Sequence, residues 1–268
     1  MNDLRIIFMG TPDFAVATLN ALIKANCNVV GVITAPDKPA GRGRKLNQSA
    51  VKKYAVENNL TVLQPTNLKD ESFLSELKLL NPNLQIVVAF RMLPKVIWKL
   101  PKYGTFNLHA SLLPDYRGAA PINWAIINGE TKTGVSTFFI DEKIDTGEVI
   151  LQKETMINDS ETVGELHDKL MEIGSKLVVE TVQLIKNKAI KTFKQPVEDT
   201  KFAPKIFNET CKINWEKPIN EIYNLIRGLN PYPAAWTILF NNSDEIKVKI
   251  YDIEKEFEIH QHKNGQLV

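Results

Sequence analysis

An amide, an imidazole and a carboxylate occur near the ends of two apolar segments of the chain. Asn107 and His109 are two residues apart, so on an extended strand their side chains point to the same side of a sheet. Asp145 follows a second apolar run, residues 134–140, in the turn-forming sequence Asp-Thr-Gly. If the two runs are neighbouring strands, the three groups meet at one edge of the sheet. Such a set can stabilise an oxyanion and relay protons while an acyl group moves to an amine.

The same segments also have a purely structural interpretation. An Asn-x-His sequence at a strand end is often a hydrogen-bonded turn, and Asp-Thr-Gly is a common Asx-turn. The spacing alone leaves both interpretations open, so the elements that carry these residues must decide between them.

Composition indicates an ordinary globular protein. The 268 residues are 44% hydrophobic and 24% charged, enough for one large domain or two modest ones. No stretch approaches the roughly 20 apolar residues of a membrane span, and the N-terminus does not resemble a signal or transit peptide. Cys27 and Cys211 are far apart and lack metal-ligand spacing, which indicates a reducing compartment. We therefore expect a cytoplasmic protein with no membrane partner.

Positive charge is concentrated in two segments, although the net charge is only +2. Residues 37–53 contain six Lys or Arg against one Asp, and residues 186–205 contain six Lys against two acidic residues. Two separate basic patches favour a polyanionic partner that is contacted at defined places. A solvated loop and a solvated linker would give the same pattern.

Strand-length apolar runs alternate with helical patterns through the first two-thirds of the chain. The predicted strands are residues 4–9, 29–33, 84–90, 105–108 and 135–140, and the predicted helices are residues 12–25, 49–58, 70–80 and 162–188. This alternation predicts an α/β fold, a Rossmann-like, doubly wound and mostly parallel sheet. Ligands of such sheets bind beyond the carboxyl ends of strands. On the last helix, His167 falls on the polar face, and we expect it to face solvent.

A change in composition near residue 188 divides the chain. We expect a catalytic domain over residues 1–188, a basic linker over 189–207 and a small β-rich domain over 208–268. The last part shows strand patterns only at 235–240 and 246–251, too few for a closed barrel. The chain lacks both Gly-x-Gly-x-x-Gly after the first strand and a Gly-Lys-Ser/Thr loop, so nucleotide cofactors are unsupported. His260 and His262 are expected to be exposed tail residues, and no metal is expected.

Several segments together resemble the folate-dependent formyltransferases. The signature segments are Asn107-x-His109, residues 111–114 and residues 145–147. Supporting segments occur in family order at residues 8–14, 36–46, 117–122, 203–206 and 227–233. Each segment alone is weak, but the ordered series is specific. The resemblance is greatest to the branch of the family that formylates methionyl-tRNA.

This resemblance implies a reaction and a set of catalytic residues. The reaction is formyl transfer from 10-formyltetrahydrofolate to the α-amine of methionyl initiator tRNA, a step of translation initiation. Asn107 and His109 would stabilise the oxyanion, while Asp145 would hold His109 and help relay protons. The protein would act as a monomer, with the folate as co-substrate, no metal and no DNA partner.

The resemblance also assigns binding residues. One set would form the folate pocket, with residues 90–93 opposite residues 111–114: Phe90, Arg91, Met92, Leu93, Ser111, Leu112, Leu113 and Pro114. Arg91 differs from the small residue that many relatives carry there. The basic loop would contact the acceptor end of the tRNA through Lys38, Arg42, Arg44 and Lys45. The C-terminal domain would be OB-like and apparently incomplete, shorter than the family's barrel by roughly 40 residues, judged by the strands such a barrel needs.

Three other functions share parts of this pattern. Sugar-nucleotide N-formyltransferases share the three polar residues and the sequence at 121–124, but they generally lack the long basic loop. A glycinamide formyltransferase would not need the C-terminal extension. A tRNA-binding relative without catalysis would not need intact Asn107, His109 and Asp145, so these residues favour an enzyme.

Replacing Arg42 and Arg44 by Ala tests the role of the basic loop. Each phosphate contact that is lost should reduce the slope of log affinity against log salt by about one unit. The measurement is tRNA binding over a series of KCl concentrations, with Lys24→Ala, in the first predicted helix, as the control. An unchanged slope in the double variant would rule out the loop as a phosphate-binding element.

Overall fold

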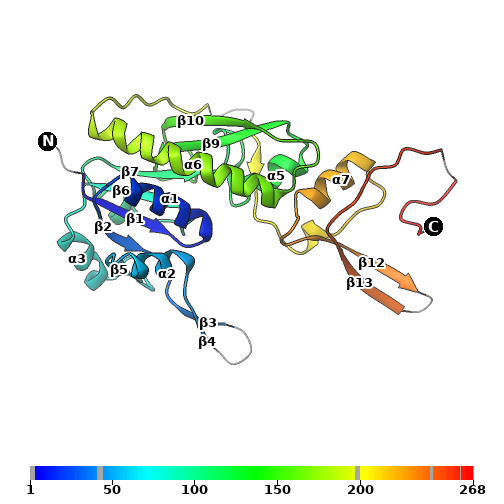
Figure 1. Ribbon diagram of the computed structural model, residues 1–268, viewed down its shortest axis with the longest axis horizontal. Helices are drawn as coiled ribbons and strands as arrows, with labels where there is room; N and C mark the ends of the chain where they lie inside the picture. Colours follow the sequence, from blue (N-terminus) through cyan, green and yellow to red (C-terminus); the bar gives the residue numbers. More distant parts are fainter. Residues whose placement is uncertain (1–3, 41–44, 197–199, 242–243, 260, 268) are drawn as a thin grey trace.

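The computed structural model describes residues 4–40, 45–196, 200–241, 244–259 and 261–267. Their main feature is a seven-stranded sheet (Figure 1). In spatial order its strands are β10 (Val149–Met156), β9 (Lys132–Phe139), β7 (Thr105–His109), β6 (Leu84–Val88), β1 (Ile6–Gly10), β2 (Val29–Ile33) and β5 (Val62–Leu63). The five strands from β7 to β5 are parallel to one another. Strand β9 is antiparallel to β7, and β10 is antiparallel to β9. The predicted mostly parallel, Rossmann-like sheet is confirmed.

Helices cover both faces of this sheet, which explains the continuous apolar runs of its central strands. Along β1, Ile6 and Phe8 belong to the core of one face, while Ile7 and Met9 belong to the core of the other. The first face packs against α1 (Asp13–Lys24), α2 (Ala50–Glu57) and α6 (Val163–Lys186), as Figure 1 shows for α1 and α6. The second packs against α3 (Glu71–Leu79) and the short α4 (Lys95–Trp98).

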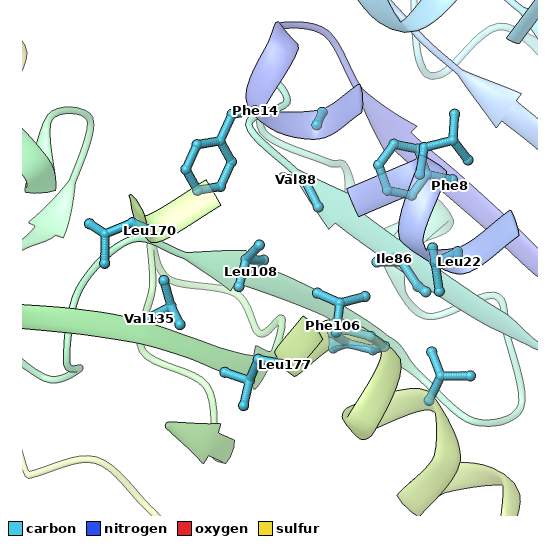
Figure 2. Close-up of a cluster of buried hydrophobic side chains, with 14 of the residues drawn as sticks. Phe8, Phe14, Leu22, Ile86, Val88, Phe106, Leu108, Val135, Leu170 and Leu177 are labelled. Carbon is cyan, nitrogen blue, oxygen red and sulfur yellow. The ribbon is translucent and has the colours of Figure 1, made fainter. Parts of the chain in front are cut away.

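The core beneath α6 joins the strands that carry the polar residues. Figure 2 shows Phe106, Leu108 and Val135 of β7 and β9 close to Leu170 and Leu177 of α6. Thr162 begins α6 with a reciprocal capping box, in which its hydroxyl accepts from the Glu165 amide and the Glu165 carboxylate accepts from the Thr162 amide. The capped helix α6 therefore packs against the face of β7 that carries Phe106 and Leu108, opposite the face that carries Asn107 and His109.

The remaining elements are small and lie outside the main sheet. They are β3 (Lys38–Ala40), β4 (Lys45–Asn47), β8 (Arg117–Gly118), α5 (Pro121–Ile127), β11 (Phe202–Ala203), a 3-10 turn (Glu209–Cys211), α7 (Ile219–Arg227), β12 (Ala235–Asn241) and β13 (Asp244–Ile250). Short strands β8 and β11 pair in parallel, so the segment after residue 188 adds a strand beside Arg117 and Gly118. Helix α7 packs beside α5, where Asn123 donates a hydrogen bond to the Gly228 carbonyl (2.8 Å).

Two hairpins project from the body of the molecule. Figure 1 shows the pair β3–β4 below the parallel sheet and the pair β12–β13 beyond α7, both on the lower side of the view. The expected small β-rich C-terminal part is therefore present, as one antiparallel pair rather than a barrel within the residues described. None of the helices described is long and apolar enough to cross a membrane.

The buried leucines of α6 should dominate its contribution to stability. Leu170 is fully buried, so Leu170→Ala should lower the free energy of unfolding by about 2–5 kcal/mol through lost burial and a residual cavity. Leu79→Ala is the control, because Leu79 is 83% exposed and its removal should cost less than about 0.5 kcal/mol. Urea denaturation of both variants measures the difference, and equal values would contradict this packing.

Candidate active site

A cavity of about 740 Å³ opens beyond the carboxyl ends of β1, β6 and β7. This is where ligands bind in open α/β sheets, and the volume suits a small-molecule ligand. Several separate segments of the chain line it. They include Pro12 and Phe14 after β1, residues 89–93 after β6, residues 107–110 of and after β7, residues 118–123, residues 140–145, Trp98 and His167.

Asn107 and His109 both face this cavity, as their spacing on β7 predicts. His109 is 6% exposed, and its Nε2 donates a hydrogen bond to the Tyr116 carbonyl (2.8 Å), since a carbonyl oxygen only accepts. The ring stands edge-on to Phe138 of the neighbouring strand. Nδ1 is therefore the ring nitrogen left for a substrate. Within the described part of the chain, the Asn107 amide has no hydrogen-bond partner, so it too is available.

Asp145 reaches His109 by a route that the sequence pattern did not predict. Because β9 is antiparallel to β7, its last residue Phe139 lies beside Phe106, at the start of β7 rather than at the end. Residues 140–148 then fold back, with the Asp141 carboxylate accepting hydrogen bonds from the amide of Lys143 and the hydroxyl of Thr146. The two apolar runs are neighbouring strands, and the three polar residues line one cavity, which Asp145 reaches through the loop after β9.

The Asp145 carboxylate is held by the backbone. Its Oδ2 accepts a hydrogen bond from the Gly118 amide (3.0 Å) and lies 3.9 Å from His109 Nδ1, an ion-pair distance longer than a hydrogen bond. Gly118 has φ +125°, and an added Cβ would lie 2.5 Å from the Ala203 carbonyl oxygen. Only glycine fits this position, where β11 approaches the site closely.

Two segments were expected to form the walls of the folate pocket, residues 90–93 and residues 111–114, and only the first lines this cavity. Phe90, Arg91, Met92 and Leu93 do line the cavity, facing residues 140–145. The Arg91 guanidinium donates to the carbonyls of Pro65 and Thr66, which ties this wall to the loop after β5.

Ser111, Leu112, Leu113 and Pro114, expected to form the opposite wall, are not among the residues that line this cavity. Ser111 is fully buried, and its carbonyl accepts from the Ser136 hydroxyl (2.6 Å), which also accepts from the Leu113 amide (3.1 Å). Gln152 donates to the Leu113 carbonyl (2.8 Å). This segment is bound to β9 and β10, so it supports the site from behind.

His167 and Phe14 also line the cavity, and neither was singled out from the sequence as a site residue. Their rings are 5.2 Å apart in an edge-to-face arrangement, which joins α6 to the start of α1. His167 was expected to face solvent, but its side chain is only 38% exposed, and Phe14 at the start of α1 packs against its ring. The supporting segment at residues 8–14 was the available signal for Phe14.

The structure tests the basic loop only at its base. Lys38 is exposed on β3, the backbone of Lys45 belongs to β4, and Arg42 and Arg44 lie outside the described residues. Asp37 anchors the base, because it accepts from Gln64 (2.8 Å) and pairs with Lys52. These hydrogen bonds, from Gln64 first and then Lys52, lower the pKa of the Asp37 carboxyl.

Aromatic and basic side chains also meet on the C-terminal hairpin. The Lys247 ammonium lies 3.8 Å from the centre of the Trp236 ring, and the Lys212 ammonium lies 5.7 Å from it. Lys205 stands over Phe207 in the same way, at 5.5 Å. Positive charge beside aromatic faces is a composition suited to nucleic acid.

Comparison with known proteins agrees with this geometry. The family described as formyl transferase matches residues 4–182, and the formyl transferase C-terminal domain matches residues 205–268. The methionyl-tRNA formyltransferase of Flavobacterium johnsoniae is 62% identical over 100% of this chain and 85% of its own length. The methionyl-tRNA formyltransferase of Bacteroides thetaiotaomicron is 56% identical over 99% of this chain and 84% of its own.

A solved structure with the same fold was determined in the presence of a folate. WlaRD, a sugar 3N-formyl transferase crystallised in the presence of dTDP and 5-N-formyl-THF, has a TM-score of 0.67 at 26% identity. The similarity covers 92% of this chain and 86% of that one. Since matches to the family extend over both parts of the sequence and these relatives share 56–62% of its residues, the chain belongs to the methionyl-tRNA formyltransferase family.

Proposed function

We propose that the protein transfers the formyl group of 10-formyltetrahydrofolate to the α-amine of methionine carried by initiator tRNA. The observation that carries the proposal is the convergence of Asn107, His109 and Asp145 on one cavity, in a chain of this family. In the reaction the amine nitrogen bonds to the formyl carbon and the bond from that carbon to N10 of the folate breaks. The amine nitrogen loses a proton, and N10 gains one.

Negative charge develops on the formyl oxygen during this transfer, and the site holds two groups suited to it. The Asn107 amide and the Nδ1–H of a protonated His109 donate hydrogen bonds to that oxygen, while Nε2 stays bound to the Tyr116 carbonyl. Asp145, 3.9 Å from Nδ1, stabilises the charged ring and takes the proton that the amine releases. Because Gly118 holds its carboxylate, Asp145 needs no rearrangement to act.

The cavity also has features that suit a folate co-substrate. Phe90, Met92, Trp98, Ile140 and Ile144 supply apolar surface for a flat ring, and the charged Asp141, Glu142 and Lys143 lie beside it. Lys95 pairs with Glu142 across this wall, which links α4 to residues 140–148. We assign residues 90–93 and 140–144 to the folate and Phe14, residues 119–123 and His167 to the aminoacyl end. Residues 111–114 support the site without contacting either.

The charge pattern outside the cavity suits a tRNA acceptor. The basic residues of the segment 38–45 contact phosphates near the acceptor end: Lys38, Arg42, Arg44 and Lys45. The Trp236 and Lys247 pair of the second hairpin contacts the stem. The chain is divided accordingly into a catalytic domain, residues 1–188, a linker, residues 189–207, and a C-terminal domain, residues 208–268.

An amino sugar is the second candidate acceptor, because WlaRD shares the fold and acts on a sugar. The deciding experiment supplies labelled 10-formyltetrahydrofolate with initiator methionyl-tRNA, elongator methionyl-tRNA or a dTDP-amino sugar, side by side. We expect formylation of the initiator tRNA alone. Transfer to the sugar, with none to either tRNA, would replace the proposed acceptor.

Asn107→Ala should lower kcat about 10²–10³-fold, because it removes one of the two donors to the oxyanion. KM for the folate should change little, since the bond strengthens only in the transition state. Asn58→Ala is the control, an exposed amide at the end of α2 away from the cavity. Near-normal turnover by the Asn107 variant would remove this residue from the mechanism.

A further inference from the structure

A buried glutamine in the linker is bound to the loop that carries Asp145. Gln195 is 9% exposed, and its Nε2 donates hydrogen bonds to the carbonyls of Asp145 (3.0 Å) and Gly147 (2.7 Å). Its Oε1 accepts two more from the Arg117 guanidinium, at 3.1 Å from Nε and 2.7 Å from a terminal nitrogen. A glutamine amide has two donor and two acceptor positions, and all four are used here.

The backbone at Asp145 needs such support. Its φ is +54°, in the left-handed region that non-glycine residues rarely adopt. Residues in this region stay there only when their surroundings determine the conformation. The Asp145 carbonyl has its partner in Gln195, and the Asp145 carboxylate has its partner in Gly118.

Arg117 closes the arrangement into a ring. It is the residue before Gly118, it is 9% exposed, and it donates to the Pro196 carbonyl (3.2 Å) as well as to Gln195. The path therefore runs from the Asp145 carboxylate through Gly118, Arg117 and Gln195 back to the Asp145 carbonyl. A single hydrogen-bond network therefore holds both the carboxylate and the backbone carbonyl of Asp145.

We propose that Gln195 is a positioning residue for Asp145, which it acts on through the backbone of residues 145–147 without touching the substrates. The inference rests on the proposed function for its catalytic consequence only. Without the two amide donors, residue 145 relaxes toward ordinary backbone angles and its carboxylate leaves the Gly118 amide and His109. The folate contacts assigned to residues 90–93 and 140–144 do not include residue 145, and we expect them to remain.

The test uses the full-length protein with three variants. Gln195→Leu removes the whole network, while Gln195→Glu keeps an acceptor for Arg117 and removes both donors to the loop. Thr192→Val is the matched control, because Thr192 lies in the same linker and bonds the Glu148 side chain (2.5 Å) but neither Asp145 nor Gly147. If Gln195→Leu fails to fold, Gln195→Glu decides the same question.

We expect both Gln195 variants to lower kcat by about tenfold or more, with KM for the folate within about twofold of the wild type. In an Asp145→Asn background the further loss should disappear, since residues that act through one another are not additive. An equal loss of kcat in that background, or normal kcat in both variants, would overturn the inference.

Hydrogen exchange of the Gly118 amide tests the positioning without any turnover. This amide donates to the Asp145 carboxylate, so its exchange should accelerate about tenfold or more in the Gln195 variants and stay unchanged in Thr192→Val. Unchanged exchange in the Gln195 variants would overturn the inference even if formyl transfer is established. An inactive wild type would overturn the proposed function alone, because the exchange result stands independently.

Discussion

The contact between the Asp145 carboxylate and the Gly118 amide is the constraint on which the arrangement of this site depends. It joins two segments that the sheet alone would keep apart, because β9 delivers the chain to the start of β7 rather than to its end. The contact holds the negatively charged Asp145 carboxylate 3.9 Å from His109 Nδ1. A backbone donor is well suited to the task, since it has no rotamers to order and cannot titrate.

Burial gives that contact its strength. The His109 ring, the Arg117 guanidinium and the Gln195 amide are each less than a tenth exposed, so their hydrogen bonds compete little with water. The same low polarity makes an unpaired group costly, which is why the network is complete. The Tyr116 side chain follows the same rule: burial first, and then its bond to Glu130, raise the pKa of its phenol. The hydroxyl therefore stays a donor, and the Tyr116 carbonyl remains in place for His109.

The sequence pattern predicted the features that neighbouring residues determine, which are the helices, the strands and the faces of each strand. The period of the apolar residues located the central strands and the long helices, and the spacing of Asn107 and His109 placed both on one face. The pattern missed β10, because the adjacent exposed residues Lys153 and Glu154 interrupt its apolar alternation. It also could not give the direction of β9, since an apolar run has the same appearance in either direction. The linker glutamine could not be found for a related reason: its four hydrogen bonds join it to residues 48, 50 and 78 positions away.

The pairing of β8 with β11 has a consequence for how the molecule is made. The composition of the chain divides it near residue 188, yet Phe202 and Ala203 complete a strand pair with Arg117 and Gly118. Chains emerge from the ribosome in order, and contacts of long sequence separation form only after both partners are available. A nascent chain that already contains the whole main sheet therefore still lacks the strand and the glutamine that contact Gly118 and Asp145. These contacts can form only after the linker has left the ribosome.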